Sequence, residues 1–184
     1  MKIGLYDVDS KIPNLALMKL SAYHKQNGDD VGWYSPLFHN AYDKIYGSKI
    51  FTFTKRKYIP SNMILGGSGI NLTTQLPEKV EHIYPDYDLY DCDYAMGFMT
   101  RGCIRNCPFC VVPKKEGNIH FNAHLSEFVK DQKRVLLLDN NVLAYSKHNE
   151  LLRELVQSDK KIDFNQGLDI RLITKENARM IKKI

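Results

Sequence analysis

The chain has 184 residues, of which 43% are hydrophobic and 26% are charged, and its net charge is +5. This composition is typical of a soluble globular protein rather than of a disordered chain. No run of about 18 apolar residues occurs, so we expect no membrane-spanning helix. The N-terminus has no apolar leader pattern, and we therefore expect a cytoplasmic protein. The modest positive charge makes RNA one partner to consider.

The first part of the chain predicts a small parallel α/β unit. A helical pattern begins after Pro13 and ends near Gly28, and strand-like apolar runs stand on both sides of it. Strand, helix and strand in this order favour a parallel sheet. We expect strands at residues 2–8, 31–34, 44–46, 49–53 and 62–65.

The remainder of the chain divides into a predicted linker and a second α/β region. Residues 76–93 are rich in Pro, Tyr and Asp and are predicted to be a linker. Residues 94–184 predict three repeats of strand, loop and helix, which are too few to close a barrel. The expected strands are 94–99, 134–139 and 161–165, and the expected helices are 122–130, 147–158 and 174–184.

Three of the four cysteines, Cys103, Cys107 and Cys110, lie within eight residues at the spacing C-x3-C-x2-C. In a cytosolic chain such a cluster indicates metal or redox chemistry rather than disulfides. Three thiolates can bind three irons of a 4Fe–4S cluster and leave the fourth iron open to a small molecule. The alternative is a structural zinc site, which needs a fourth ligand. The candidates for that ligand are Cys92, His82, His120 and His124.

The cysteine segment, with Phe109 directly before its last cysteine and a predicted strand before it, resembles the radical S-adenosylmethionine (SAM) superfamily. The resemblance implies that Cys103, Cys107 and Cys110 bind a 4Fe–4S cluster and that Phe109 lies against the adenine of SAM. It also implies an enzyme that uses an electron from a reductant protein to cleave SAM to a 5′-deoxyadenosyl radical. A methyl or methylthio transfer to RNA is one outcome of such chemistry, and the sequence does not identify the substrate.

Polar residues follow the two later strands of the second region. Asp139, Asn140 and Asn141 resemble a segment that contacts the SAM amino group in some members of the superfamily, and the alternative is a plain turn. After the third strand, Gln166, Asp169 and Arg171 are expected to bind SAM or the substrate, because the strands of a β/α barrel carry their site at the carboxyl ends. The alternative for Asp169 and Arg171 is a structural ion pair with each other.

Residues 1–75 resemble the Rossmann-like domain that precedes some radical SAM barrels and binds cobalamin in several of them. The loop after the first strand, residues 7–13, has no histidine in the place that a D-x-H-x-x-G motif requires. Cobalt ligation by this loop is therefore not supported, and cobalamin bound without a protein ligand is the alternative. The glycines at 66–69 suit either a nucleotide-like tail or a tight turn.

The fold class expected from the sequence is thus α/β, with a Rossmann-like domain (residues 1–75), a linker (76–93) and a partial radical SAM barrel (94–184). The expected function is that of a radical SAM enzyme or of its N-terminal part. The alternatives are a zinc-stabilised nucleic-acid-binding module and a catalytically silent iron–sulfur protein.

Overall fold

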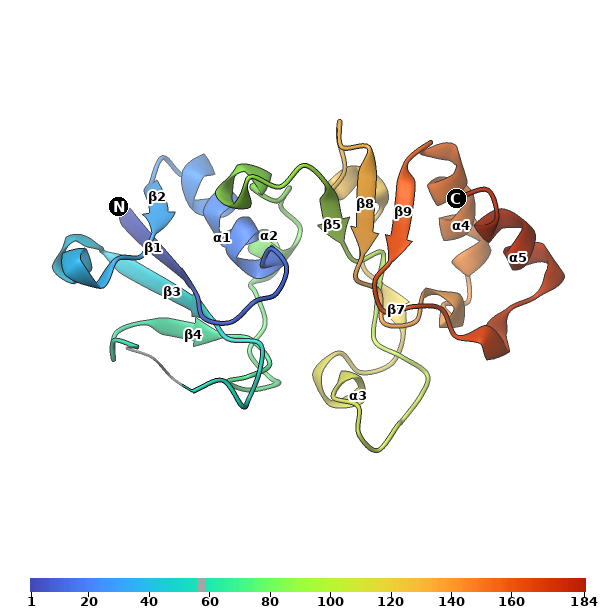
Figure 1. Cartoon of the computed structure of the whole chain (residues 1–184), viewed down its shortest axis with the longest axis horizontal. Helices are drawn as coiled ribbons and strands as arrows, with labels where there is room; N and C mark the ends of the chain where they lie inside the picture. The colour runs from blue at the N-terminus through green and yellow to red at the C-terminus, as the bar shows by residue number, and fades with distance from the viewer. Residues whose placement is uncertain (56–58) are drawn as a thin grey trace. The chain divides into compact units, whose positions relative to one another are not determined.

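The computed structural model describes residues 1–55 and 59–184. The chain divides into two compact units, a first unit of Met1–Cys92 and a second unit of Asp93–Ile184 (Figure 1). Both units contain parallel sheets together with helices, so the α/β class predicted from the sequence is confirmed. No helix in the described ranges has the length and apolar character needed to cross a membrane.

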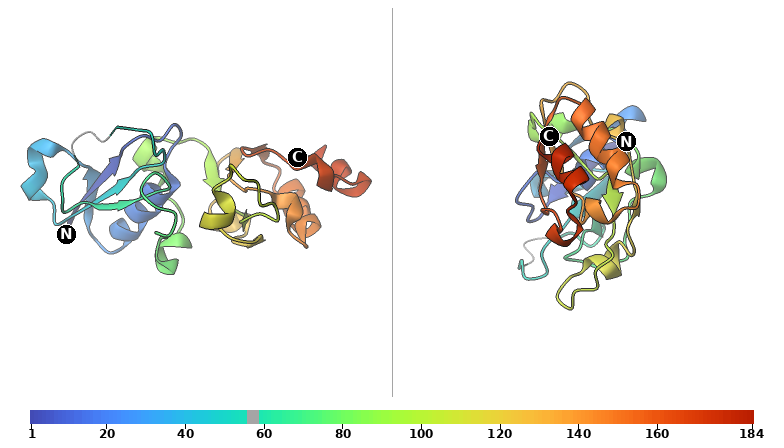
Figure 2. Two further views of the ribbon diagram at one scale, coloured as in Figure 1. Left: turned by 90° about the horizontal axis from the view of Figure 1, so that it is seen from below. Right: turned by 90° about the vertical axis from the view of Figure 1, so that its right-hand side faces the viewer.

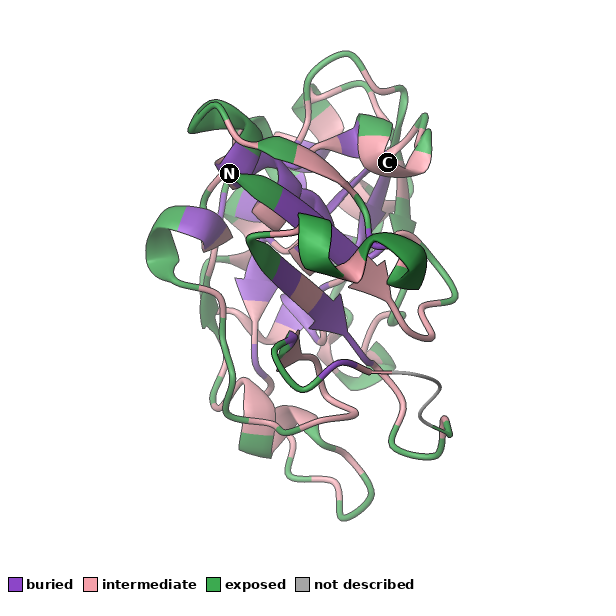
Figure 3. Cartoon of the chain, turned by 90° about the vertical axis from the view of Figure 1, so that its left-hand side faces the viewer, coloured by how far each residue is buried: buried purple, intermediate pink, exposed green. Residues whose placement is uncertain are grey.

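The first unit is built on a four-stranded sheet with the order β2-β1-β3-β4, in which every neighbouring pair is parallel. The inner strand β1 is apolar and buried: Ile3 and Leu5 are fully buried. Leu5 pairs with Trp33 of β2 on one side and with Tyr46 of β3 on the other. Buried residues lie along β1 and β3, whereas β2 and β4 have none (Figure 3). The strands are β1 (Lys2–Asp7), β2 (Asp30–Trp33), β3 (Lys44–Ser48) and β4 (Ile64–Gly66).

Helix α1 (Leu15–Gln26) packs against β1, β2 and β3 and supplies Leu17 to the core formed by Ile3 and Leu5. The helix begins where the Asn14 side chain accepts a hydrogen bond from the Leu17 amide at 3.2 Å. The chain leaves the helix at Gly28, whose φ of +78° lies in the left-handed region that favours glycine after a helix.

The predicted linker is packed onto the first unit. The Lys19 ammonium on α1 lies 3.0 Å from the Glu81 carboxylate, and the Tyr90 hydroxyl donates to Asp7 at 2.6 Å. Residues 76–92 therefore belong to the first unit, and the boundary between the units lies between Cys92 and Asp93. This segment forms the short helix α2 (Glu78–Glu81) and the 3-10 turn η2 (Tyr87–Tyr90).

The strand expected at residues 49–53 is a loop instead. The Asp9 carboxylate accepts hydrogen bonds from the backbone amides of Ile50 at 2.7 Å and Phe51 at 3.1 Å. These amides would otherwise be donors in a sheet, so the aspartate replaces a neighbouring strand as their partner.

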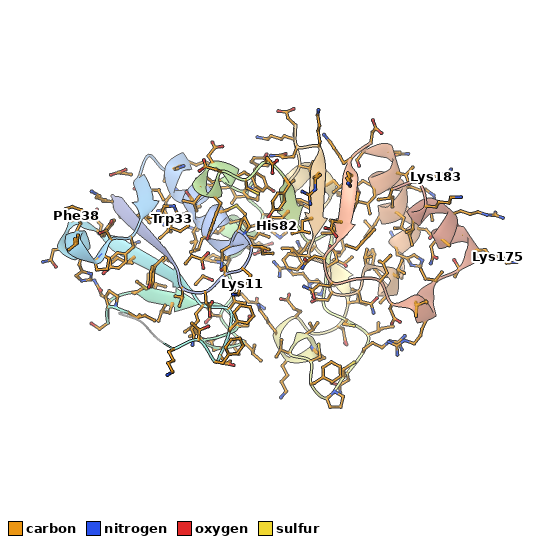
Figure 4. All side chains as sticks on the ribbon, viewed as in Figure 1. Lys11, Trp33, Phe38, His82, Lys175 and Lys183 are labelled. Atoms are coloured by element: carbon orange, nitrogen blue, oxygen red, sulfur yellow. The ribbon has the colours of Figure 1, made fainter. Side chains whose placement is uncertain are left out.

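A surface turn of the first unit carries apolar side chains. The 3-10 turn η1 (Pro36–Ala41) exposes Leu37 and Phe38, and Trp33 on β2 is 44% exposed. Figure 4 shows Trp33 and Phe38 on this part of the molecule. The turn contributes no buried residue to the core of the unit.

The second unit contains a three-stranded parallel sheet with the order β5-β8-β9. Strand β8 therefore lies between β5 and β9 and is parallel to both. Helix α4 buries three leucines, and helices α4 and α5 contact each other (Figure 2). The elements are β5 (Ala95–Gly97), β8 (Arg134–Leu137), α4 (His148–Gln157), β9 (Lys161–Phe164) and α5 (Lys175–Ile181).

The helix expected at residues 122–130 is a correction to the sequence prediction, since this segment forms only the 3-10 turn η3 (Leu125–Glu127). The Leu125 amide donates to the Glu154 carboxylate at 2.7 Å, and Phe128 packs over Gly97. A Cβ at Gly97 would lie 2.5 Å from the Phe128 ring. The single turn buries both Leu125 and Phe128. Strands β8 and β9 are each followed by an α-helix, as the predicted repeat requires, whereas the segment expected to be the helix after β5 forms only this turn.

Candidate functional site

The cysteine loop, residues 102–118, is closed at its base by a short antiparallel pair. Strand β6 (Thr100–Arg101) pairs with β7 (His120–Phe121), and the Cys103 amide donates to the Gly117 carbonyl at 3.2 Å. Gly102 has a φ of +80°, and a Cβ there would lie 2.3 Å from the Asn118 carbonyl oxygen. Only glycine fits this position, which brings the two ends of the loop together.

Arg101 strengthens this closure with its side chain. Its guanidinium donates to the Glu116 carboxylate at 3.1 Å and to the Asn122 amide oxygen at 3.1 Å. The same group lies 4.0 Å from the centre of the Phe98 ring, within the range of a cation–π contact. An ion pair, a hydrogen bond and a cation–π contact thus fix the base of the loop. The loop itself contains the single-turn helix α3 (Val112–Lys115).

The three cysteines of the loop are free thiols and are half-buried. The Cys103 sulfur accepts hydrogen bonds from the Arg105 amide at 3.3 Å and from the Asn141 side-chain amide at 3.5 Å. Donors at sulfur stabilise a thiolate and are one means by which proteins tune iron–sulfur clusters. Among the described residues, no three His, Cys, Asp or Glu side chains are gathered so as to hold one metal ion. In a cubane cluster each cysteine binds a different iron.

Asp139, which follows β8, is bonded to the strand end that leads into the cysteine loop. Its carboxylate accepts from the Met99 amide at 3.1 Å and from the Thr100 amide and hydroxyl at 2.5 and 2.6 Å. Burial raises the pKa of Asp139, against the opposing effect of these hydrogen bonds. Asp139 therefore positions the residues before the loop, and its predicted contact with SAM stays a prediction.

Asn141 is 4% exposed and lies directly beside Cys103. Its amide nitrogen donates to the sulfur, whereas its oxygen is one of two buried side-chain atoms, among the described residues, that have no hydrogen-bond partner. A buried amide oxygen without a donor is costly, and an ordered water, an ion or a ligand would offset that cost. Asn140, by comparison, is half-buried.

Asp169, which follows β9, is held by two arginines. It accepts from the Arg171 guanidinium at 2.7 Å and from the Arg105 guanidinium at 3.0 Å. The bonds from Arg171, and then that from Arg105, hold the pKa of Asp169 well below its ordinary value, against the opposing effect of burial. The ion pair between Asp169 and Arg171 is thus formed in the structure. The sequence analysis missed Arg105, although its place between two loop cysteines was a signal.

Arg171 also lies within electrostatic range of the thiols. Its pKa is raised first by the hydrogen bond to Asp169 and that carboxylate's charge, and further by the charges of Cys107 and Cys103. Hydrogen bonds thus connect the cysteine loop, through Cys103 and Arg105, to Asn141 and Asp169, and connect Asp169 to Arg171. Two other predicted residues are exposed instead: Phe109, which is 89% exposed, and Gln166.

Two of the histidines considered for the zinc alternative, His120 and His124, have other partners in the second unit. His120 bonds to the Asn118 carbonyl at 2.9 Å, and His124 bonds to the Glu154 carboxylate at 2.9 Å. The other two candidates, Cys92 and His82, belong to the first unit.

Comparisons of the sequence with models of protein families and with curated proteins found no match.

Proposed function

We propose that the chain is a radical SAM enzyme or the N-terminal part of one, and that its second unit binds a 4Fe–4S cluster through Cys103, Cys107 and Cys110. The observation that carries the proposal is the contact between Cys103 and Asn141, whose buried oxygen lacks a donor. A thiol loop therefore lies next to an unsatisfied acceptor at the carboxyl ends of parallel strands, which is where β/α folds carry their sites.

The residues present suit both parts of the implied cofactor. Three thiols and two N–H donors to one sulfur are suited to an iron–sulfur cluster, and the Arg171 cation offsets the negative charge of thiolates. The amino group of SAM is a donor of the kind that the Asn141 oxygen lacks, and the exposed Phe109 ring offers a surface for adenine. When bound, the cluster and SAM supply one-electron cleavage to a 5′-deoxyadenosyl radical.

The finer fold assignment is part of the same proposal. The first unit is proposed to be Rossmann-like, supported by its parallel order β2-β1-β3-β4 with α1 against the sheet. The second is proposed to be the opening part of a β/α barrel, supported by the consecutive order β5-β8-β9. The proposed reaction requires a low-potential electron-donor protein, and RNA as the substrate remains a prediction from charge and resemblance.

Anaerobic reconstitution with ferrous iron and sulfide tests the proposal. The wild-type chain should take up about four iron and four sulfide per chain, the content of a cubane cluster, and become brown. Cys107→Ala should lose most of this uptake, whereas Cys92→Ala, which changes a cysteine outside the loop, should retain it. With SAM and dithionite, the loaded wild type should release 5′-deoxyadenosine.

Two results would overturn the proposal in different ways. Colourless protein with one zinc per chain would favour the zinc-stabilised nucleic-acid-binding module. A stable cluster without 5′-deoxyadenosine, under conditions in which the cluster is reduced, would favour a catalytically silent iron–sulfur protein.

A further inference from the structure

An arginine–carboxylate–arginine bridge, formed by Arg105, Asp169 and Arg171, connects the cysteine loop to the segment after β9. Asp169 is at its centre with a side chain only 9% exposed, whereas the Arg105 and Arg171 side chains are 33% and 65% exposed. Both arginines approach the carboxylate at 3.0 Å or less. Arg105 and Asp169 are 64 positions apart in the sequence, so their contact attaches the cysteine loop to a distant part of the second unit.

The bridge carries a net positive charge next to the thiols. Two guanidinium groups share one carboxylate, so one positive charge remains uncompensated within the bridge. Arg105 lies between Cys103 and Cys107 in the loop, and Asp169 joins Arg171 to it by hydrogen bonds of 3.0 and 2.7 Å. A charged group that lies next to the ligands of a metal site, without binding the metal, changes its reduction potential.

We propose that this bridge makes the cluster easier to reduce, and that Arg171 is the positioning residue that supplies the effect. The inference rests on the proposed function. Reduction transfers one electron from a low-potential one-electron donor to the cluster, and no bond forms or breaks. The cluster gains one negative charge, so a nearby cation stabilises the reduced state more than the oxidised state.

The experiment is a reductive titration of the reconstituted full chain with dithionite, without SAM, followed by electron paramagnetic resonance. In Arg171→Gln the ratio of reduced to oxidised cluster at a fixed potential should fall about tenfold, which corresponds to about 59 mV for a one-electron couple. The difference should shrink at high salt, because Arg171 is largely exposed. Omitting SAM separates this effect from any role of Arg171 in binding SAM.

Asp169→Asn provides a test of opposite sign. It removes the negative charge and leaves both arginines, so the cluster should become easier to reduce than in the wild type. A purely structural role of the bridge would make the two variants alike. Should Arg171→Gln take up no cluster, Asp169→Asn decides alone, and a potential equal to or below that of the wild type rejects the inference.

Lys175→Gln is the matched control, because it removes a positive charge from the exposed first turn of α5, where Figure 4 shows the side chain extending outward. Its potential should equal that of the wild type. An unchanged potential in Arg171→Gln, or an equal shift in Lys175→Gln, overturns the inference. A wild-type chain that binds no cluster rejects the proposed function instead, so the two failures are distinguishable.

Discussion

Replacing Asp139 by alanine should destabilise the second unit by about 3 kcal/mol. The carboxylate joins the end of β8 to the residues that lead into the cysteine loop. It is the acceptor for three donors, namely the Met99 amide and the amide and hydroxyl of Thr100. The variant keeps the backbone in place but removes every one of these bonds.

The magnitude follows from the burial of those donors. Met99 and Thr100 are fully buried, so water cannot replace the carboxylate without opening the structure. An unsatisfied buried donor costs about 1–3 kcal/mol, so three donors give about 3–9 kcal/mol. The burial that raises the pKa of Asp139 shows that the wild type also bears a desolvation cost, which the variant avoids. We therefore expect the lower end of the range, still a large part of the roughly 5–15 kcal/mol that stabilises a typical domain.

The assay has to report on the second unit specifically. Trp33, the single tryptophan, lies in the first unit, so its fluorescence follows that unit and serves as an internal control. Hydrogen exchange of the peptide spanning 94–101, measured across a urea series, follows the second unit, and far-ultraviolet circular dichroism follows both units together. Asp163→Ala, at an exposed position on β9, is the matched control. If Asp139→Ala unfolds with the midpoint of the control, the carboxylate does not hold this strand end.

The pH dependence gives an independent check on the same residue. A raised pKa means that folded Asp139 holds its proton more tightly than the unfolded chain does. Its contribution to stability should therefore fall as the pH rises above the ordinary value of 3.8 toward the raised value. Asp139→Asn removes the titrating group, so the difference in unfolding free energy between the wild type and this variant should change with pH in that window. A constant difference would contradict the assigned direction.

Two further predictions concern one packing contact and one ion pair. Gly97→Ala should destabilise the second unit by about 1–3 kcal/mol in the same urea assay, because the added methyl meets the Phe128 ring, and a wild-type midpoint would contradict this close packing. In the first unit, hydrogen bonds with the N-terminal ammonium and His24 lower the pKa of Asp29, and the bond to Asp29 raises the pKa of the Met1 amino group. Stability of the first unit should decline as the pH falls below 3.8 and as it rises above 8.0, and Asp29→Asn should flatten both declines when tryptophan fluorescence is followed.

The elements that the sequence predicts well are those whose signals are local. The apolar residues Ile3 and Leu5 indicate a buried strand wherever it pairs, and the helical pattern predicted between Pro13 and Gly28 corresponds to α1. The cysteine spacing is also local, so the sequence predicts a loop that carries three thiols without knowledge of the remaining fold.

The errors arise where distant residues supply the partners. Residues 76–92 have the composition of a linker, yet contacts such as that between Tyr90 and Asp7, 83 positions apart, attach them to the first unit. Likewise, the helix expected at 122–130 is shortened because Phe128 finds its place over Gly97 in a strand that precedes it by about 30 residues. Local pattern cannot report such partners, because each depends on the packing of the whole unit.

The candidate site shows the same division between local and distant information. Strand order predicts that residues after β8 and β9 lie near the cysteine loop, and Asn141 and Asp169 do contact it. Strand order does not predict which side chain of the run 139–141 is satisfied by the protein itself. Only the hydrogen-bond partners separate Asp139, with three donors, from Asn141, with an unpaired oxygen.

That separation decides how the two residues should be interpreted. A buried polar group whose bonds are all made within the chain contributes to the fold, and its loss is felt as instability. A buried group that lacks a partner adds a cost to the fold, which an ordered water, an ion or a ligand would offset. Asp139 and Asn141 stand two positions apart and are equally buried, yet the first supports the strand end before the cysteine loop and the second leaves an acceptor open beside Cys103.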